Sequence, residues 1–250
     1  MVMGLSMTII QCGKAQFTDI QAVLFDKDGT LADSQAYLRQ LSYARSQLIA
    51  AQVPGIQDDL LLTFGVVGDS VNPAGLMAVG TRQENVIAAA ARVTAWGKDW
   101  LDSLNLVQSA FARADTQMPL KARATPLFQG AYEVLSALNQ ADVQVGILSS
   151  DTTENVQEFV ACYRLESLVQ LQLGADARFT KPDPALLFHA CQLLSVPVGR
   201  SLVVGDSKAD IEMARSVGIA SVGVTWGWNA DFDLGQPDIQ IQCWSEISIL

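Results

Sequence analysis

Residues 22–34 read Ala-Val-Leu-Phe-Asp-Lys-Asp-Gly-Thr-Leu-Ala-Asp-Ser, and this stretch decides the interpretation of the whole chain. Four apolar residues are followed by two carboxylates, Asp26 and Asp28. Residues i and i+2 of a β-strand point to the same face, so the stretch delivers two acids to one place. That place is the carboxyl end of a strand, where open α/β sheets bind their ligands.

Two carboxylates this close together predict a cation or a retained proton beside them, because like charges repel. A metal ion combined with a proton-carrying acid suits phosphoryl transfer. Lys27 lies between the two acids, and the pleat of the strand predicts that its side chain points away from Asp26. We therefore expect Lys27 to be structural.

The composition limits the possible partners. Half of the 250 residues are hydrophobic and the formal net charge is −10, which allows a sizeable core and disfavours binding to nucleic acid. No stretch approaches the roughly 20 apolar residues that a membrane helix needs. The four cysteines are far apart and lack a metal-binding spacing, so we expect reduced thiols. These features predict a soluble, cytoplasmic protein, either a monomer or a homodimer, that binds no membrane.

Patterns typical of strands and of helices alternate between residues 126 and 224. Strands are expected at 143–148, 168–173, 202–204 and 220–224, with helices between them. Asp151-Thr-Thr-Glu154 predicts a capping box that opens one of these helices. The alternation predicts a three-layer α/β/α, Rossmann-like core with a mostly parallel sheet.

Residues 35–125 have a different pattern, with helical spacing of apolar residues at 35–51, 84–92 and 98–113 and no convincing strand. We therefore expect an all-helical cap domain at 35–125, inserted into a core domain made of 1–34 and 126–250. A small β-hairpin is also expected at 8–17, around Gly13.

Polar residues follow the other expected strands. Ser149 comes directly after the strand 143–148, and Asp206 follows the strand 202–204, with Asp210 one helical turn later. Lys181 precedes a proline and a helix. Because the carboxyl ends of parallel strands meet at one edge of a sheet, we expect these side chains to gather around Asp26.

In order and spacing, four segments resemble the motifs of the haloacid dehalogenase (HAD) superfamily, and within it the phosphoglycolate phosphatase-like group: Asp26-Lys-Asp-Gly-Thr-Leu-Ala-Asp-Ser34, Ile147-Leu-Ser-Ser150, Lys181-Pro-Asp-Pro184 and Val204-Gly-Asp-Ser-Lys-Ala-Asp210. The resemblance implies a Mg²⁺-dependent phosphatase that hydrolyses a small phosphomonoester through an aspartyl-phosphate. Dehalogenases of the superfamily lack a counterpart of Asp28, which argues against cleavage of carbon–halogen bonds.

The resemblance also implies a role for each residue. Asp26 would be the nucleophile, and Asp28 would act as general acid and then as general base. Lys181 would take part in catalysis and bind the phosphoryl group, and the other phosphate-binding residues would be Thr30, Ser149 and Ser150. The implied ligands of Mg²⁺ are Asp26, Asp28 (through its backbone carbonyl), Asp206 and Asp210. For Asp210 the alternatives are a contact to Lys181 or a simple preference for the positive end of its helix.

The sequence of the expected cap does not identify the substrate. Residues 75–82 read Gly-Leu-Met-Ala-Val-Gly-Thr-Arg, and Arg82 either binds a carboxylate or second phosphate of the substrate or lies on the surface of a packed turn.

Two other functions compete with the phosphatase. A phosphomutase would use the same aspartyl-phosphate, and a non-catalytic binding protein could have the same fold.

Overall fold

The structure, a computed structural model, describes residues 8–175, 179–228 and 232–250. The chain forms two compact units. The first contains residues 8–33, Leu127–Gly227 and Asp233–Leu250, and the second contains Ser34–Pro126 together with Trp228 and Phe232. Among the described residues, no helix combines the length and the apolar character needed to span a bilayer.

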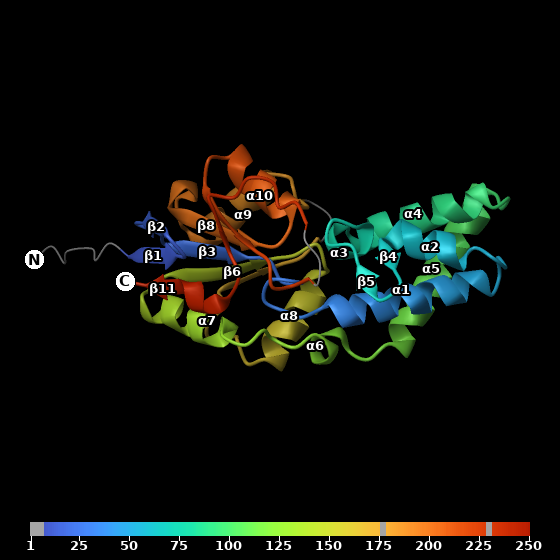
Figure 1. Cartoon of the computed structure of the whole chain (residues 1–250), viewed down its shortest axis with the longest axis horizontal. Coiled ribbons are helices and arrows are strands. Elements are labelled where there is room, and N and C mark those ends of the chain that lie inside the picture. Colours follow the sequence, from blue (N-terminus) through green and yellow to red (C-terminus); the bar gives the residue numbers. More distant parts are fainter. Residues whose placement is uncertain (1–7, 176–178, 229–231) are drawn as a thin grey trace, which may run out of the picture. The chain divides into compact units, whose positions relative to one another are not determined.

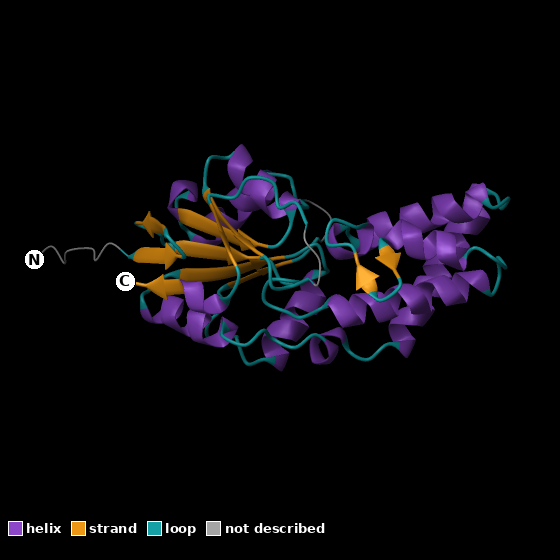
Figure 2. Cartoon of the chain, in the orientation of Figure 1, coloured by secondary structure: helices purple, strands orange, loops and turns teal. Residues whose placement is uncertain are grey.

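A six-stranded sheet forms the centre of the first unit, and every pair of neighbouring strands in it is parallel (Figure 1 and Figure 2). In spatial order the strands are β10 (Ile239–Ile241), β9 (Ala220–Val224), β8 (Ser201–Gly205), β3 (Ala22–Phe25), β6 (Gln144–Leu148) and β7 (Leu171–Leu173).

Helices cover both faces of this sheet. In Figure 1, α9 (Ala185–Leu194) and α10 (Lys208–Ser216) lie on one face, and α7 (Ala131–Gln140) and α8 (Thr153–Cys162) lie on the other. On the first face, Leu24 of β3 packs in one buried cluster with Leu187 of α9 and Met213 of α10. The predicted three-layer α/β/α core with a parallel sheet is confirmed.

The register of the central strands decides where the site lies. Phe25, the last residue of β3, pairs with Ile147 of β6 on one side and with Val204 of β8 on the other. The three strands therefore end at nearly the same level. Each of the polar segments that follow them begins at one edge of the sheet, as expected for a ligand site of an open α/β sheet.

A second, three-stranded antiparallel sheet lies in the same unit. Its strands are β11 (Ile247–Ile249), β1 (Ile9–Cys12) and β2 (Ala15–Thr18), in that order. Strands β1 and β2 form a hairpin, and Gly13 in its turn has a φ of +54°, a conformation that favours glycine. The predicted N-terminal hairpin is confirmed. The sequence did not predict that β1 also pairs with the C-terminal strand β11.

The second unit is mainly helical. Its helices are α1 (Gln35–Ala50), α2 (Gln57–Phe64), α3 (Leu76–Val79), α4 (Arg82–Ala95), α5 (Trp100–Gln117) and α6 (Lys121–Ala124). Phe64 of α2 and Phe111 of α5 are fully buried at its centre, with ring centroids 6.1 Å apart. Thr81 opens α4 with a capping box to Glu84.

The expectation that this region contains no strand was wrong. An antiparallel hairpin joins β4 (Val66–Val67) to β5 (Ser70–Val71). Val67 and Ser70 flank a two-residue turn at Gly68 and Asp69, and Gly68 has a φ of +56°. This is a hairpin signal in itself, but two-residue strands are too short for an alternating pattern to reveal them.

Candidate functional site

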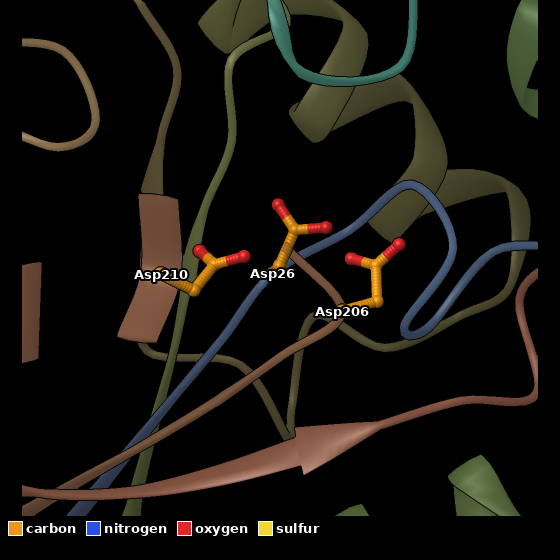
Figure 3. Close-up of side chains that lie close together, drawn as sticks. All are labelled: Asp26, Asp206 and Asp210. Atoms are coloured by element: carbon orange, nitrogen blue, oxygen red, sulfur yellow. The ribbon is translucent and has the colours of Figure 1, made fainter. Parts of the chain in front are cut away.

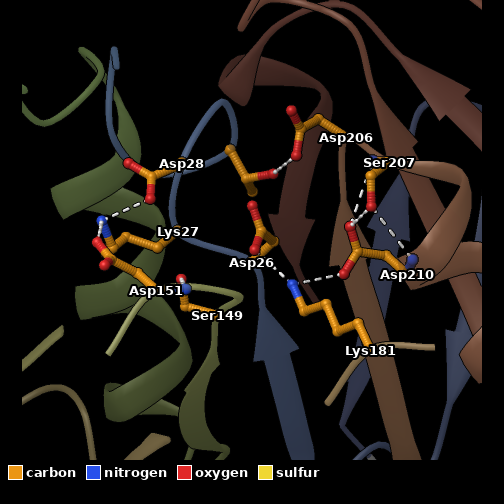
Figure 4. A network of polar contacts seen from close by, with 10 residues as sticks. Asp26, Lys27, Asp28, Ser149, Asp151, Lys181, Asp206, Ser207 and Asp210 are labelled. Atoms are coloured by element: carbon orange, nitrogen blue, oxygen red, sulfur yellow. Dashed lines mark hydrogen bonds and ion pairs between the residues drawn. The ribbon is translucent and has the colours of Figure 1, made fainter. Parts of the chain in front are cut away.

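Asp26 is the first residue after β3, and its backbone N–H donates to the carbonyl of Val204 at 2.9 Å. Its buried side chain accepts a hydrogen bond from the ammonium of Lys181 through Oδ1 (Figure 4). The same ammonium contacts Oδ1 of Asp210 at 2.7 Å. One buried cation therefore joins two buried carboxylates.

Burial and charge act against each other in this group. Burial raises the pKa of Asp26 to about 6, although the neighbouring Lys181 lowers it. Burial alone lowers the pKa of Lys181, but the carboxylates of Asp210 and Asp26 raise it by more, so its net pKa shift is upward. At neutral pH the lysine is therefore charged, and Asp26 is mainly a carboxylate that can act as a nucleophile.

Three buried carboxylates, those of Asp26, Asp206 and Asp210, offer oxygens that all lie within 4.8 Å of one another (Figure 3). Asp206 follows β8 directly, and the level ends of β3 and β8 place it beside Asp26. Two oxygens on opposite sides of a Mg²⁺ ion are about 4.2 Å apart, and this ion prefers oxygen ligands. The residues present therefore fit a small, hard divalent cation.

The contacts of Asp210 favour a role on Lys181. Its Oδ1 contacts that lysine, while its Oδ2 accepts from the hydroxyl of Ser207 at 2.6 Å and from the backbone N–H of Ser207 at 3.2 Å. Both oxygens are already engaged with donors. A Cβ on Gly205 would lie 2.5 Å from Cγ of Asp210, so a glycine is required where the carboxylate folds back over the strand end.

Thr30 lies in the turn after Asp28, and its buried hydroxyl donates to Oδ1 of Asp206 at 3.1 Å. A hydroxyl has one proton to donate. In this arrangement the hydroxyl of Thr30 orients a carboxylate of the site. The expectation that Thr30 binds the phosphoryl group stays a prediction. The linear motif does not show that Asp206, a residue far away in the sequence, lies within reach of this hydroxyl.

Ser149 follows β6, and its buried hydroxyl oxygen accepts from the backbone N–H of Asp151 at 3.1 Å. Its backbone N–H donates to the carbonyl of Leu173 at 3.0 Å, which fixes the residue at the strand end. Because a lone pair of the hydroxyl is used in this way, its proton can be donated to a ligand. Ser150 is the next residue of the loop and is half-buried.

The N-cap of α8 lies one residue later than the predicted capping box places it. Thr152, not Asp151, is the N-cap, and its hydroxyl accepts from the N–H of Asn155 at 3.2 Å. Threonine fills an N-cap position well, so the local pattern allowed both assignments. The carboxylate of Asp151 instead pairs with the ammonium of Lys27 at 3.2 Å.

A loop after β9 packs against the turn that carries the acids. The indole N–H of Trp226 donates to the carbonyl of Thr30 at 2.9 Å. A Cβ on Gly227 would lie 2.1 Å from the carbonyl oxygen of Gly29, so this approach is open to glycine alone. The sequence signal for this contact is a glycine between two tryptophans.

We therefore expect Gly227→Ala to lower kcat by at least about 10-fold, because the added methyl group displaces the turn that carries Asp28. The crowding should also lower the free energy of unfolding by about 1–3 kcal/mol. Steady-state kinetics and urea unfolding measure the two effects. Gly199→Ala is the matched control, since a Cβ there has no atom within 4 Å. Equal behaviour of the two variants would contradict this role of Gly227.

Arg82 belongs to the second unit, at the start of α4. Its guanidinium contacts Oδ2 of Asp115 at 2.6 Å, and Oδ1 of the same carboxylate contacts the buried Arg45 at 3.4 Å. Its side chain is 42% exposed. Arg82 is therefore ion-paired and partly accessible, and it is not one of the residues that gather around Asp26 within the first unit.

Comparison with known proteins gives consistent results. The sequence model of the haloacid dehalogenase-like hydrolases matches residues 20–218. The chain is 28% identical to the phosphoglycolate phosphatase of Escherichia coli strain K12 over 238 residues, which is 91% of this chain and 90% of that protein.

Two solved structures illustrate the similarity of fold. A predicted phosphoglycolate phosphatase from Haemophilus somnus 129PT aligns with a TM-score of 0.65 and 22% identity, over 89% of this chain and 94% of that one. A Thermotoga maritima protein of proposed β-phosphoglucomutase function aligns with a TM-score of 0.59 and 18% identity, over 89% of this chain and 94% of that one.

Proposed function

Because the chain belongs to the haloacid dehalogenase-like hydrolases and is a phosphatase of that family, we propose that it hydrolyses a small phosphomonoester through an aspartyl-phosphate on Asp26. Phosphoglycolate is the first substrate to test, since it is the substrate in the names of relatives that match nine-tenths of the chain. The observation that carries the proposal is the buried carboxylate of Asp26, held by Lys181 at the sheet edge where Asp206 and Ser149 also lie.

The proposed reaction has two halves. In the first, a carboxylate oxygen of Asp26 forms a bond to phosphorus while the bond from phosphorus to the ester oxygen breaks, and Asp28 gives its proton to that oxygen. In the second, Asp28 takes a proton from a water molecule whose oxygen attacks the phosphorus. The bond between phosphorus and Asp26 then breaks, and inorganic phosphate leaves.

The other residues hold the phosphoryl group and offset its charge. Lys181 and Ser149 donate to its oxygens, with Ser150 as a further candidate donor, while Asp210 keeps the ammonium of Lys181 in place. We propose Mg²⁺ as the cation, held by Asp26, Asp206 and the backbone carbonyl of Asp28. When bound, this ion offsets negative charge on the reacting phosphoryl group.

We propose that the second unit acts as a cap and binds the part of the substrate beyond the phosphoryl group. Arg82 is its candidate for a substrate carboxylate, which would compete with Asp115 for the guanidinium. The cytoplasm is the expected location of the reaction.

A screen of phosphorylated metabolites for phosphate release tests this function. A phosphomutase of the same family would return the phosphoryl group to its substrate. Release of one inorganic phosphate for each substrate molecule consumed supports the phosphatase. Consumption of sugar phosphate without release of phosphate would identify the mutase, and failure of every phosphomonoester would reject the proposal.

We expect EDTA to abolish hydrolysis and added Mg²⁺ to restore it, because the carboxylates need a cation to accept an anionic substrate.

The stabilisation of the protein by Mg²⁺ should also depend on pH. Burial raises the pKa of Asp26 to about 6. Protons therefore compete with the metal below that pH, and the apparent affinity should fall about 10-fold near pH 5 relative to pH 7.5.

Thermal unfolding measures this dependence. Because the pKa of Asp26 is raised on folding, the metal-free protein loses the contribution of Asp26 to stability as the pH rises from about 4 to about 6. The increase in Tm caused by Mg²⁺ should accordingly be larger near pH 7.5 than near pH 5. An increase that is independent of pH would show that Asp26 does not hold the ion.

A further inference from the structure

A second buried ammonium lies in the site, and the two-step reaction does not use it. Lys27 is 1% exposed, and its Nζ lies 2.7 Å from Oδ2 of Asp28 and 3.2 Å from Oδ2 of Asp151. Figure 4 shows these polar contacts of Lys27 on the other side of Asp26 from Lys181. Burying the charge of a lysine costs free energy. Because Lys27 contacts the predicted proton donor, this cost points to a role in the reaction and not only in packing.

Asp151 is a fixed anchor for this lysine. Its Oδ1 accepts from the backbone N–H of Thr152 at 2.9 Å and from the side-chain amide of Asn155 at 2.6 Å, both at the start of α8. Its backbone carbonyl accepts from the N–H of Ala175 at 2.7 Å. Asp151 is thus held through both its side chain and its main chain, and its second oxygen, Oδ2, meets Lys27.

Lys27 itself is held at both ends. Its backbone carbonyl accepts from the N–H groups of Leu31 at 2.9 Å and Ala32 at 2.8 Å, which closes the turn that carries Asp28. Its ammonium lies 5.8 Å from the centroid of the Phe159 ring. The pairing of Lys27 with Asp151 is neutral overall, so the lysine can hold Asp28 without adding net charge to the site.

We propose that Lys27, anchored on Asp151, is a positioning residue that orients Asp28 for proton transfer. An ammonium has donors only, so the oxygen that it binds, Oδ2, must act as an acceptor. The proton of Asp28 is then carried on Oδ1. In the first half-reaction this proton moves to the ester oxygen as the bond from phosphorus to that oxygen breaks, and Lys27 keeps its own protons. The inference rests on the proposed function.

The leaving group distinguishes orientation from simple support of the fold. An alkoxide is a poor leaving group and needs the proton, whereas p-nitrophenolate leaves readily without it. Loss of the correct orientation of Asp28 should therefore slow transfer from an alkyl phosphate much more than transfer from an aryl phosphate. Damage to the fold or to phosphate binding would slow both alike.

The experiment compares Lys27→Met with the wild type in the first turnover, before the shared hydrolysis of the aspartyl-phosphate. Rapid-quench release of glycolate from phosphoglycolate should slow by about 100-fold, and release of p-nitrophenol from p-nitrophenyl phosphate by no more than about 3-fold. Lys14→Met, which removes an exposed ammonium in the β1–β2 turn of the same unit, should leave both rates unchanged.

Asp151→Asn provides the second variant, because Lys27→Met removes a buried charge and could fail to fold. It keeps the volume and one acceptor but removes the charged anchor, and the same selective loss, of about 10-fold on the alkyl phosphate, is expected. Equal losses on both substrates, or no loss, in the folded variants would overturn the proposal. If the wild type hydrolyses no phosphomonoester of the screen, or Asp26→Asn still turns over, the proposed function fails instead.

Discussion

Replacement of Asp26 by asparagine is expected to lower the rate of phosphate release by at least about 10⁴-fold while the protein stays folded. An amide oxygen is a poor nucleophile, so the bond to phosphorus does not form. The fold should tolerate the change, because burial raises the pKa of Asp26 and so disfavours its charge. Lys181 also keeps Asp210 as a partner.

Three measurements check this prediction: phosphate release, thermal unfolding of the metal-free protein, and mass spectrometry of acid-quenched enzyme for an added phosphoryl group. The wild type should carry the group during turnover, and the variant should not. Asp142→Asn is the matched control, since Asp142 is exposed and has a φ of +57°, which asparagine also adopts. A variant of Asp26 with near-normal turnover would remove the nucleophile from the mechanism.

Replacement of Lys181 by methionine is expected to have two effects. The value of kcat/KM should fall by about 10³-fold, because the phosphoryl oxygens lose a fixed positive charge. The free energy of unfolding of the metal-free protein should fall by about 3–5 kcal/mol, because two buried carboxylates lose the ammonium that they share. Urea unfolding and steady-state kinetics measure the two effects separately.

A double variant separates the structural effect from the catalytic one. Adding Asp210→Asn to Lys181→Met removes one of the two buried charges, so part of the lost stability should return. Activity should not return, because the cation for the phosphoryl group is still missing. If Lys181→Met were as stable as the wild type, the lysine would not be the counter-ion of the two carboxylates.

Much of this arrangement could be predicted because it depends on local patterns and on one rule of topology. The runs that form β3, β6 and β8 are apolar and short, and each is followed directly by a polar residue. Once the strands are parallel and in level register, Asp26, Ser149 and Asp206 must meet at one edge. The spacing along the chain was therefore sufficient for the core and for the residues that gather there.

Other features could not be predicted because their partners are distant in the sequence. Thr30 was expected to bind phosphate, yet its hydroxyl lies on Asp206. Asp151 was expected to cap a helix, yet its carboxylate pairs with Lys27. In both cases the observed partner depended on which groups the fold brought within hydrogen-bond distance, and a short motif does not contain that information.

By itself, the sequence determined the α/β core and the presence of acids at the strand ends, because strand periodicity and side-chain type are local properties. Only the tertiary structure decided which donor each carboxylate meets: Lys181 for Asp26 and Asp210, and Lys27 for Asp28 and Asp151. The physical reason is that hydrogen bonds act over about 3 Å. Such distances between residues far apart in the chain are set by packing and not by spacing in the sequence.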